Sequence, residues 1–289
     1  MKKYLPFILL MIILATLAGC KSNGANPTIQ NPPQVSIPAP EEPKPAPTPV
    51  AVENPAKEPT QVSSKPLSWW FTRNQEHQPA SINKDIAALL AENNAFYLQP
   101  NNSKKIYLTF DCGYELGYTP KILDILSTKK VKAHFFITGQ FIQTQPELVK
   151  RMQSSGHLVC NHTLNHPDLP TLSQEKFNQE IKSLEQKYSD LTGGQMARYL
   201  RPPMGNYSPT TLKWTNDLGY ATVFWSMAFQ DWDPNKQPGA TFSHQHVLDN
   251  IHPGAVILLH AVSQSNTEAL EQIITDLQAQ GYIFSTFGG

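Results

Sequence analysis

The sequence predicts an α/β fold, a distorted, TIM-like (β/α) barrel of about seven parallel strands, in residues 105–289. Short β-prone apolar runs alternate with amphipathic, helix-like segments about every 20–30 residues, which is typical of parallel βαβ units. About seven such units in roughly 185 residues favour a barrel over an open sheet. Polar residues follow several of the apolar runs, at the strand ends where a parallel barrel carries its active site.

The individual elements follow from apolar periodicity and from helix start and stop residues. Three helix starts are predicted to carry cap residues, Thr119, Ser208 and Ser265. Proline follows the first two, and Glu268 completes a potential capping box with the third. The predicted strands are 106–110, 133–137, 157–160, 221–225, 255–259 and 282–285.

Residues 1–19 are predicted to be a signal peptide, because Lys2 and Lys3 precede about a dozen apolar residues and a group of small ones. The apolar run is short for a membrane span of about 20 residues. Residues 17–20 read Leu-Ala-Gly-Cys, which resembles the lipoprotein box of bacterial lipoproteins. The resemblance implies that Cys20 is lipidated and that the protein is extracytoplasmic, anchored to a bacterial membrane. A plain signal peptide with an incidental cysteine is the alternative.

Residues 20–66 are predicted to form a proline-rich, disordered linker behind the anchor. Twelve of the 25 prolines lie between Lys21 and Pro66, where large apolar residues are almost absent. An extended chain of this length reaches on the order of 100 Å, which suits a substrate that stands off the membrane, such as cell wall. A passive stalk is an equally good explanation. Residues 67–104 are expected to be an N-terminal extension packed on the barrel domain, 105–289.

The charge balance excludes one class of partner. Lys plus Arg is 23 and Asp plus Glu is 23, with no basic block, so the sequence offers no electrostatic basis for binding nucleic acid. We expect a monomer.

Residues with catalytic or metal-binding chemistry gather at the predicted strand ends. His162 and His166, four residues apart after a strand, can share one face and bind a metal ion. Each candidate alone has an ordinary structural explanation, such as a helix cap, a surface ion pair or a core histidine. Their joint position at strand ends favours one functional site. The candidates are Asp111, Cys112, Tyr114, His162, His166, Arg201, Met204, Asp231, Trp232 and His260.

The chain from about Trp69 to Phe287 resembles the polysaccharide deacetylase family. The family motifs Thr-Phe-Asp-Asp-Gly-Tyr, His-Ser/Thr-x-x-His and Arg-x-Pro-x-Gly correspond to residues 109–114, 162–166 and 201–205, and its fourth and fifth motifs to 231–232 and 258–260. Residues 70–79, 95–98 and 224–229 are similar, more narrowly, to the subgroup that makes muramic δ-lactam in spore peptidoglycan.

Amide hydrolysis needs an activated water, stabilisation of the oxyanion and an acid for the leaving amine. The resemblance implies that Asp111 is the general base and His260 the general acid, that Asp231 orients His260, and that Arg201 keeps Asp111 ionised. It also implies that the substrate is contacted by Tyr114, Trp232 and the backbone N–H of Met204, which is a candidate oxyanion donor.

The sequence departs from the family at Cys112, which stands where the family's usual third metal ligand is an aspartate. We expect one divalent metal ion, most simply zinc, on His162 and His166. Cys112 is an optional thiolate ligand, and water is an alternative third ligand. The remaining interpretation is a metal-free, non-catalytic domain. A Cys112–Cys160 disulfide would remove the thiolate.

An enzyme that removes N-acetyl groups from cell-wall glycan is therefore the favoured function. The subgroup resemblance implies N-acetylmuramic residues of peptidoglycan, with the peptidoglycan glycan strand as partner and a role in sporulation. Chitooligosaccharide, N-acetylglucosamine or xylan substrates are alternatives. A non-catalytic peptidoglycan-binding lipoprotein is the alternative of another class, but it has no need of an acid and a base.

Overall fold

The computed structural model describes residues 62–100 and 103–288. The predicted signal peptide, the lipidated Cys20 and most of the predicted linker lie outside these residues. Within the described part, no helix combines the length and the apolar character needed to cross a bilayer.

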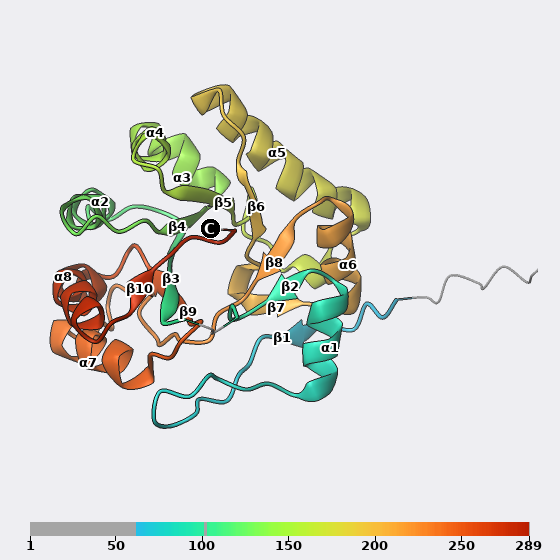
Figure 1. Cartoon of the computed structure of the whole chain (residues 1–289). Coiled ribbons are helices and arrows are strands. Elements are labelled where there is room, and N and C mark those ends of the chain that lie inside the picture. Colours follow the sequence, from blue (N-terminus) through green and yellow to red (C-terminus); the bar gives the residue numbers. More distant parts are fainter. Residues whose placement is uncertain (1–61, 101–102, 289) are drawn as a thin grey trace, which may run out of the picture. The chain divides into compact units, whose positions relative to one another are not determined.

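The predicted barrel of parallel strands is confirmed: among the described residues, eight strands form one parallel sheet that curls on itself (Figure 1). β3, the longest of them, pairs with both β4 and β9, so the first motif lies in the middle of the sheet. The strands are β2 (Ala95–Phe96), β3 (Lys105–Cys112), β4 (His134–Ile137), β5 (Leu158–Asn161), β6 (Ala197–Leu200), β8 (Ala221–Val223), β9 (Val256–His260) and β10 (Ile283–Phe284).

The barrel is distorted where its edges meet. Single bridges join Leu98, just after β2, to Ala255, and Met227, just after β8, to Ile257 of β9. The backbone N–H of Leu258 donates to the carbonyl of Met227. The segment after β8 therefore lies beside β9, and this contact later places Asp231 next to His260.

Helices surround the sheet (Figure 1). They are α1 (Lys84–Glu92), α2 (Thr119–Thr128), α3 (Gly139–Thr144), α4 (Pro146–Ser154), α5 (Gln174–Thr192), α6 (Pro209–Asp217), α7 (Ala240–Asn250) and α8 (Gln264–Ala279). Three of them, α1, α3 and α7, were not predicted, and α1 lies in the segment before residue 105, for which no helix was predicted. α3 has only six residues, and α7 has a weakly amphipathic sequence, so neither carries a strong periodic signal.

The predicted helix caps are partly correct. Ser208 caps α6, since its side chain accepts a hydrogen bond from the third helical N–H. α8 is capped by Ser263, whose hydroxyl accepts from the N–H of Asn266, so Ser265 lies inside the helix. Thr119 is the first residue of α2 and not its cap. Both errors displace a helix start by one or two residues.

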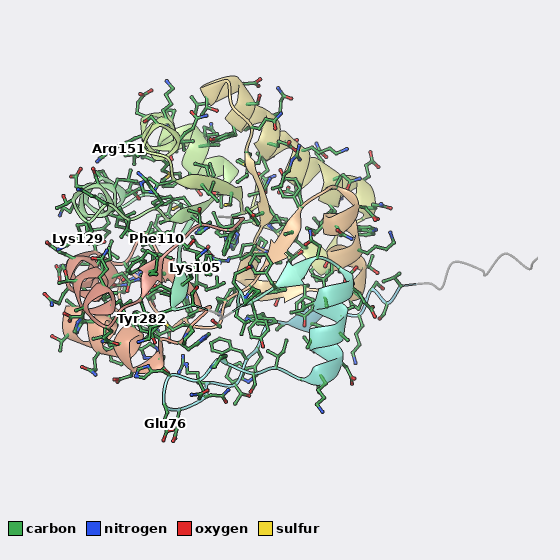
Figure 2. All side chains as sticks on the ribbon, in the orientation of Figure 1. Glu76, Lys105, Phe110, Lys129, Arg151 and Tyr282 are labelled. Atoms are coloured by element: carbon green, nitrogen blue, oxygen red, sulfur yellow. The ribbon has the colours of Figure 1, made fainter. Side chains whose placement is uncertain are left out.

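Side chains along β3 alternate between the outer face of the sheet and the inside of the barrel. Phe110 and Cys112 belong to the apolar cluster between the sheet and the outer helices, with Phe110 labelled in Figure 2. Tyr107 belongs instead to the cluster inside the barrel. Thr109 and Asp111 share its parity and are also buried. Successive side chains of a strand point to opposite faces, so Asp111 faces the barrel interior and Cys112 faces outward.

The segment expected to be an N-terminal extension is part of the barrel. Its β2 is a strand of the main sheet, beside β8, and its β1 (Leu67–Ser68) pairs with β7 (Asn206–Tyr207). The N–H of Trp69 donates to the carbonyl of Gly205, and the Trp69 ring stacks on Phe224 at 4.4 Å. Gly205 has φ 69°, and an added Cβ would lie 2.9 Å from the Trp225 ring, so glycine is required there. Residue 105 is therefore not a structural boundary.

Candidate active site

Most of the predicted strand-end residues line one cleft, and Arg201 and Asp231 lie behind its wall in contact with Asp111 and His260. The cleft volume is about 1060 Å³, and Asp111, His162, His166 and His260 all lie in its wall. These residues come from β3, from the loop after β5 and from β9, which bring their carboxyl ends to the same side of the parallel sheet.

Asp111 is held by a buried ion pair. Arg201 Nη1 donates to Asp111 Oδ1 at 2.7 Å, and both side chains are buried. Burial by itself raises the pKa of the Asp111 carboxyl, but the charges of Arg201 and the nearby histidines outweigh it and hold the pKa below its ordinary value. Asp111 is therefore a carboxylate at neutral pH, with Oδ2 left free of Arg201.

Arg201 is fixed by its surroundings. Its guanidinium centre lies 4.1 Å from the ring centroid of Phe136 and 5.8 Å from that of Trp225, and Nε donates to the carbonyl of Val223. Stacking between two aromatic rings suits the planar guanidinium. The side chain is completely buried, so its charge acts on Asp111 without screening by solvent.

His162 has a defined tautomer. Its Nδ1 lies 2.8 Å from the carbonyl oxygen of Arg201, which can only accept, so Nδ1 carries the proton and Nε2 has a free lone pair. Burial lowers the pKa of His162 to about 4. Nε2 lies 3.6 Å from Asp111 Oδ2. His162 is thus a neutral imidazole whose lone pair is directed toward the carboxylate.

The second histidine reaches the site through a strained turn and not through a helix. Thr163 and His166 have φ of 69° and 56°, in the left-handed region that non-glycine residues rarely adopt. This turn brings the His162 and His166 rings to a centroid separation of 4.9 Å. The four-residue spacing predicted the proximity correctly, but for the wrong local geometry.

Two neighbouring elements support the histidine loop. Glu180 of α5 accepts hydrogen bonds from the backbone and side chain of Asn165 at 2.8 and 2.7 Å. Gly139 N–H donates to the carbonyl of Leu164, and a Cβ on Gly139 would lie 2.4 Å from that oxygen. The loop is therefore clamped between α3 and α5.

His260 differs from the neutral His162, because its surroundings favour the positively charged form. Its Nδ1 lies 2.7 Å from Asp231 Oδ1, and its backbone N–H donates to Asp231 Oδ2 at 2.8 Å. Asn266 also donates to Asp231 Oδ2. Burial alone lowers the pKa of His260, but the carboxylate of Asp231 overcomes this effect and raises it above the ordinary value. His260 is thus favoured as an imidazolium with Nε2–H free to donate.

Cys112 does not join the histidines. The described residues contain no group of three His, Cys, Asp or Glu side chains placed to hold a metal ion. Cys112 is absent from the cleft wall and completely buried in the outer apolar cluster, where burial raises the pKa of its thiol well above the ordinary value. The optional thiolate ligand is therefore not supported, because strand alternation turns this side chain away from the cleft.

The alternative disulfide is also not formed. Cys112 and Cys160 are both free and buried. They lie on β3 and β5 with β4 between them, about 10 Å apart at ~4.8 Å per strand, and they face opposite sides of the sheet. A disulfide needs Cα atoms within about 7 Å.

The cleft opening is formed by exposed side chains. Tyr114, Met204 and Trp232 line it as predicted, and the Trp232 ring centroid is 5.7 Å from that of His260. Met204 has φ 58°, a third left-handed residue beside the cleft. The cleft wall also includes residues that were not among the candidates, and Trp70, Arg73 and Lys187 are the exposed aromatic and cationic ones of interest. The sequence signals for the first two were the aromatic run that begins at Trp69 and the resemblance of residues 70–79 to the δ-lactam subgroup.

The residues present suit a divalent metal ion. Two imidazoles lie side by side and the lone pair of His162 Nε2 is available, so the fit rests on the two histidines and not on a third side chain of the described residues. Its other nitrogen is bonded to a backbone carbonyl, the usual arrangement for metal-binding histidines. Zinc accepts imidazole ligands readily and leaves remaining positions open for water.

Comparisons with known proteins agree with this site. A family model described as polysaccharide deacetylase matches residues 98–223. The chain is 47% identical over 225 residues to the peptidoglycan-N-acetylmuramic acid deacetylase PdaA of Bacillus subtilis, covering 78% of this chain and 86% of that protein. It is 36% identical over 191 residues to a peptidoglycan-N-acetylglucosamine deacetylase of Bacillus cereus, covering 65% and 68%.

Solved structures give the same result. The structure of Bacillus subtilis PdaA, a family 4 carbohydrate esterase, matches with a TM-score of 0.76 and covers 78% of this chain and 96% of that one. A family 4 carbohydrate esterase from Bacillus anthracis, 42% identical, matches with a TM-score of 0.66 and covers 78% and 95%. This chain therefore belongs to the polysaccharide deacetylase family and is a hydrolase that acts on N-acetyl amide bonds.

Proposed function

We propose that the protein removes the acetyl group from N-acetylmuramic residues of peptidoglycan, the step that permits δ-lactam formation in a sporulation-type cell wall. The observation that carries the chemistry is the presence in one cleft of Asp111, which is paired with Arg201, and His260, which is paired with Asp231. The substrate assignment is supported by 47% identity to a peptidoglycan-N-acetylmuramic acid deacetylase.

Asp111 is the general base. Its Oδ1 is occupied by Arg201, so Oδ2 is the atom that takes a proton from the attacking water as the water oxygen bonds to the acetyl carbonyl carbon. The low pKa of Asp111 keeps this oxygen unprotonated before each cycle.

His260 is the general acid. Its Nε2–H gives a proton to the amide nitrogen as the C–N bond breaks, which releases acetate and leaves a free amine on the sugar. Asp231, held in turn by Asn266, stabilises the imidazolium and fixes the ring.

His162 and His166 would hold one divalent ion, for which we propose zinc. Such an ion would polarise the acetyl carbonyl and the attacking water. The remaining ligand positions would be taken by water and substrate, because Cys112 faces the outer cluster.

We also propose that Cys20 carries a lipid anchor and that residues 21–66 carry the domain to the wall. The sequence pattern supports this topology. A Cys20→Ser variant should leave the membrane fraction and keep full activity; retention in membranes would contradict the lipoprotein assignment.

A monomer is sufficient, since one chain supplies the base, the acid and both histidines.

The function is tested with purified residues 21–289 on peptidoglycan glycan strands and on chitooligosaccharides. Released acetate is measured with and without chelator, and digested strands are analysed by mass spectrometry. Loss of acetyl groups from muramic residues is expected. Loss confined to glucosamine residues would favour the N-acetylglucosamine alternative, and no acetate from any glycan would favour the non-catalytic one.

A further inference from the structure

The cleft contains a cation that neither the catalytic groups nor the fold explains. Arg73 lines the cleft and is exposed. Among the ion pairs of the described residues, none involves Arg73. Glu76 is the nearest acid in sequence, and it points away from the protein at the tip of its loop (Figure 2). Arg73 thus has no carboxylate partner in the described part of the chain.

The guanidinium is nevertheless held in place. Arg73 Nη2 donates to the carbonyl oxygen of Ala228 at 2.6 Å, and its central carbon lies 5.9 Å from the Phe71 ring centroid. A guanidinium has five N–H donors, so one hydrogen bond leaves donors free for an anion. Partial fixation also reduces the entropy lost when an anion binds.

The hydrogen bond to Ala228 places Arg73 on the side of the cleft that holds the general acid His260. Ala228 lies in the segment after β8, three residues before Asp231, which holds the general acid His260. Phe229 and Gln230, the residues between Ala228 and Asp231, also line the cleft. An anion bound by Arg73 would therefore lie along the same wall as His260.

The substrate class proposed above has an anion in the matching place. In a muramic residue the acetamido group is on C2 and the lactyl ether is on the adjacent C3. A sugar whose amide nitrogen faces His260 therefore carries its lactyl carboxylate only a few bonds away. An N-acetylglucosamine residue has a neutral hydroxyl at C3.

We propose that Arg73 binds the lactyl carboxylate and so selects muramic over glucosamine residues, an inference that rests on the proposed function. Planar bidentate recognition of carboxylates is the characteristic chemistry of arginine. The other cations of the site are less suited: Arg201 is buried against Asp111, and Lys187 comes from α5, the helix that clamps the histidine loop. Met204 in the third motif is apolar and cannot bind the carboxylate.

The experiment compares two substrates that differ only in this charge. Glycan strands freed of stem peptides carry lactyl carboxylates; the same strands treated with carbodiimide and ammonia carry neutral primary amides. Acetate release gives kcat and KM for wild type, Arg73→Gln, Arg73→Lys and Lys187→Gln. The Lys187 variant removes the other exposed cation of the cleft.

With the carboxylate strands, Arg73→Gln should lower kcat/KM by about 10- to 100-fold, mainly through KM, the usual effect of losing a hydrogen bond to a charged group. With the amide strands, wild type and Arg73→Gln should be equal. Arg73→Lys should recover part of the loss, and Lys187→Gln should leave the ratio between the two substrates unchanged.

Two results would contradict the inference about Arg73, and a third would contradict the proposed substrate. An equal loss on both substrates would assign Arg73 a structural role through Ala228, and unchanged kinetics of Arg73→Gln would assign it no role. If instead the wild-type enzyme releases acetate only from glucosamine residues, the proposed substrate itself is wrong, and the inference about Arg73 falls with it.

Discussion

The floor and the rim of the cleft differ in how deeply their side chains are buried and in how they are held. The floor consists of Asp111 and His162, which both hydrogen-bond to Arg201 behind them, and all three residues are buried. The rim includes Trp70 and Trp232, whose exposed fractions are 81% and 52%. Floor residues follow the central strands of the barrel, whereas rim residues come from the N-terminal segment and from loops.

The buried floor therefore suits catalysis, and the exposed rim suits substrate binding. Buried charges act without solvent screening and need no reorganisation during the reaction, which favours catalysis. Exposed rings and cations can contact a large substrate and can be exchanged without disturbing the core. Substitutions in the floor should therefore reduce turnover and stability, and substitutions in the rim should change substrate affinity alone.

The largest effect is expected at Asp111. Asp111→Asn removes the base and should lower turnover by about 10²- to 10⁴-fold. It also leaves the completely buried Arg201 without its charge partner, which should cost about 3–5 kcal/mol of unfolding free energy, measured by urea denaturation. Adding Arg201→Met should restore much of the stability and none of the activity. Wild-type turnover in Asp111→Asn would remove it from the mechanism.

The next largest effect is expected at the histidine pair, in which His162 belongs to the floor and His166 is exposed. His162→Ala and His166→Ala should each lose bound zinc and most activity, because two imidazoles are the proposed protein ligands. Metal content is measured by mass spectrometry of the purified protein. His244→Ala is the control, since His244 pairs with Asp276 away from the cleft wall and should keep the metal. Full metal content in both site variants would place the ion elsewhere.

A smaller change is expected in the pH profile when Asp231 is altered. His260 must be protonated to donate, and Asp231 raises its pKa, so wild-type kcat should fall as the pH rises through that raised value. Asp231→Asn removes the carboxylate and should move this basic limb to lower pH. The acid limb, set by the low pKa of Asp111, should stay in place. An unmoved basic limb would mean that another group is the acid.

At the rim, Trp70→Ala should raise KM for long glycan strands by about 2- to 10-fold through loss of stacking and should leave kcat unchanged. Phe242→Ala is the matched control, because Phe242 is an exposed aromatic residue that does not line the cleft. A fall in kcat for Trp70→Ala would mean that the rim also positions the floor.

The smallest functional effect is expected at Cys112. Cys112→Ala should keep its metal and activity and lose only about 1 kcal/mol of stability, since the side chain packs in the outer apolar cluster. Loss of metal from this variant would restore the thiolate interpretation and contradict the outward orientation.

The barrel and most of the floor could be predicted from local patterns in the sequence. Short apolar β-prone runs and helical apolar patterns, together with caps such as Ser208, are local properties that do not depend on distant residues. Motif spacing around His162 predicted two adjacent imidazoles, because four residues of chain cannot separate far. The strand-end rule for parallel barrels then assigned Asp111 and His260 to the same edge.

How these residues pair could not be predicted locally, because it depends on contacts between distant segments. Asp111 and Arg201 are 90 positions apart in the chain, and their contact depends on the order in which the strands pair. The direction of Cys112 depends on strand parity, which its motif position does not reveal. Arg73 reaches the cleft because β1 and β2 fasten its segment to strands formed more than 100 residues later. Local patterns are set by neighbours in sequence, whereas these contacts are set by packing between segments that meet only in the folded barrel.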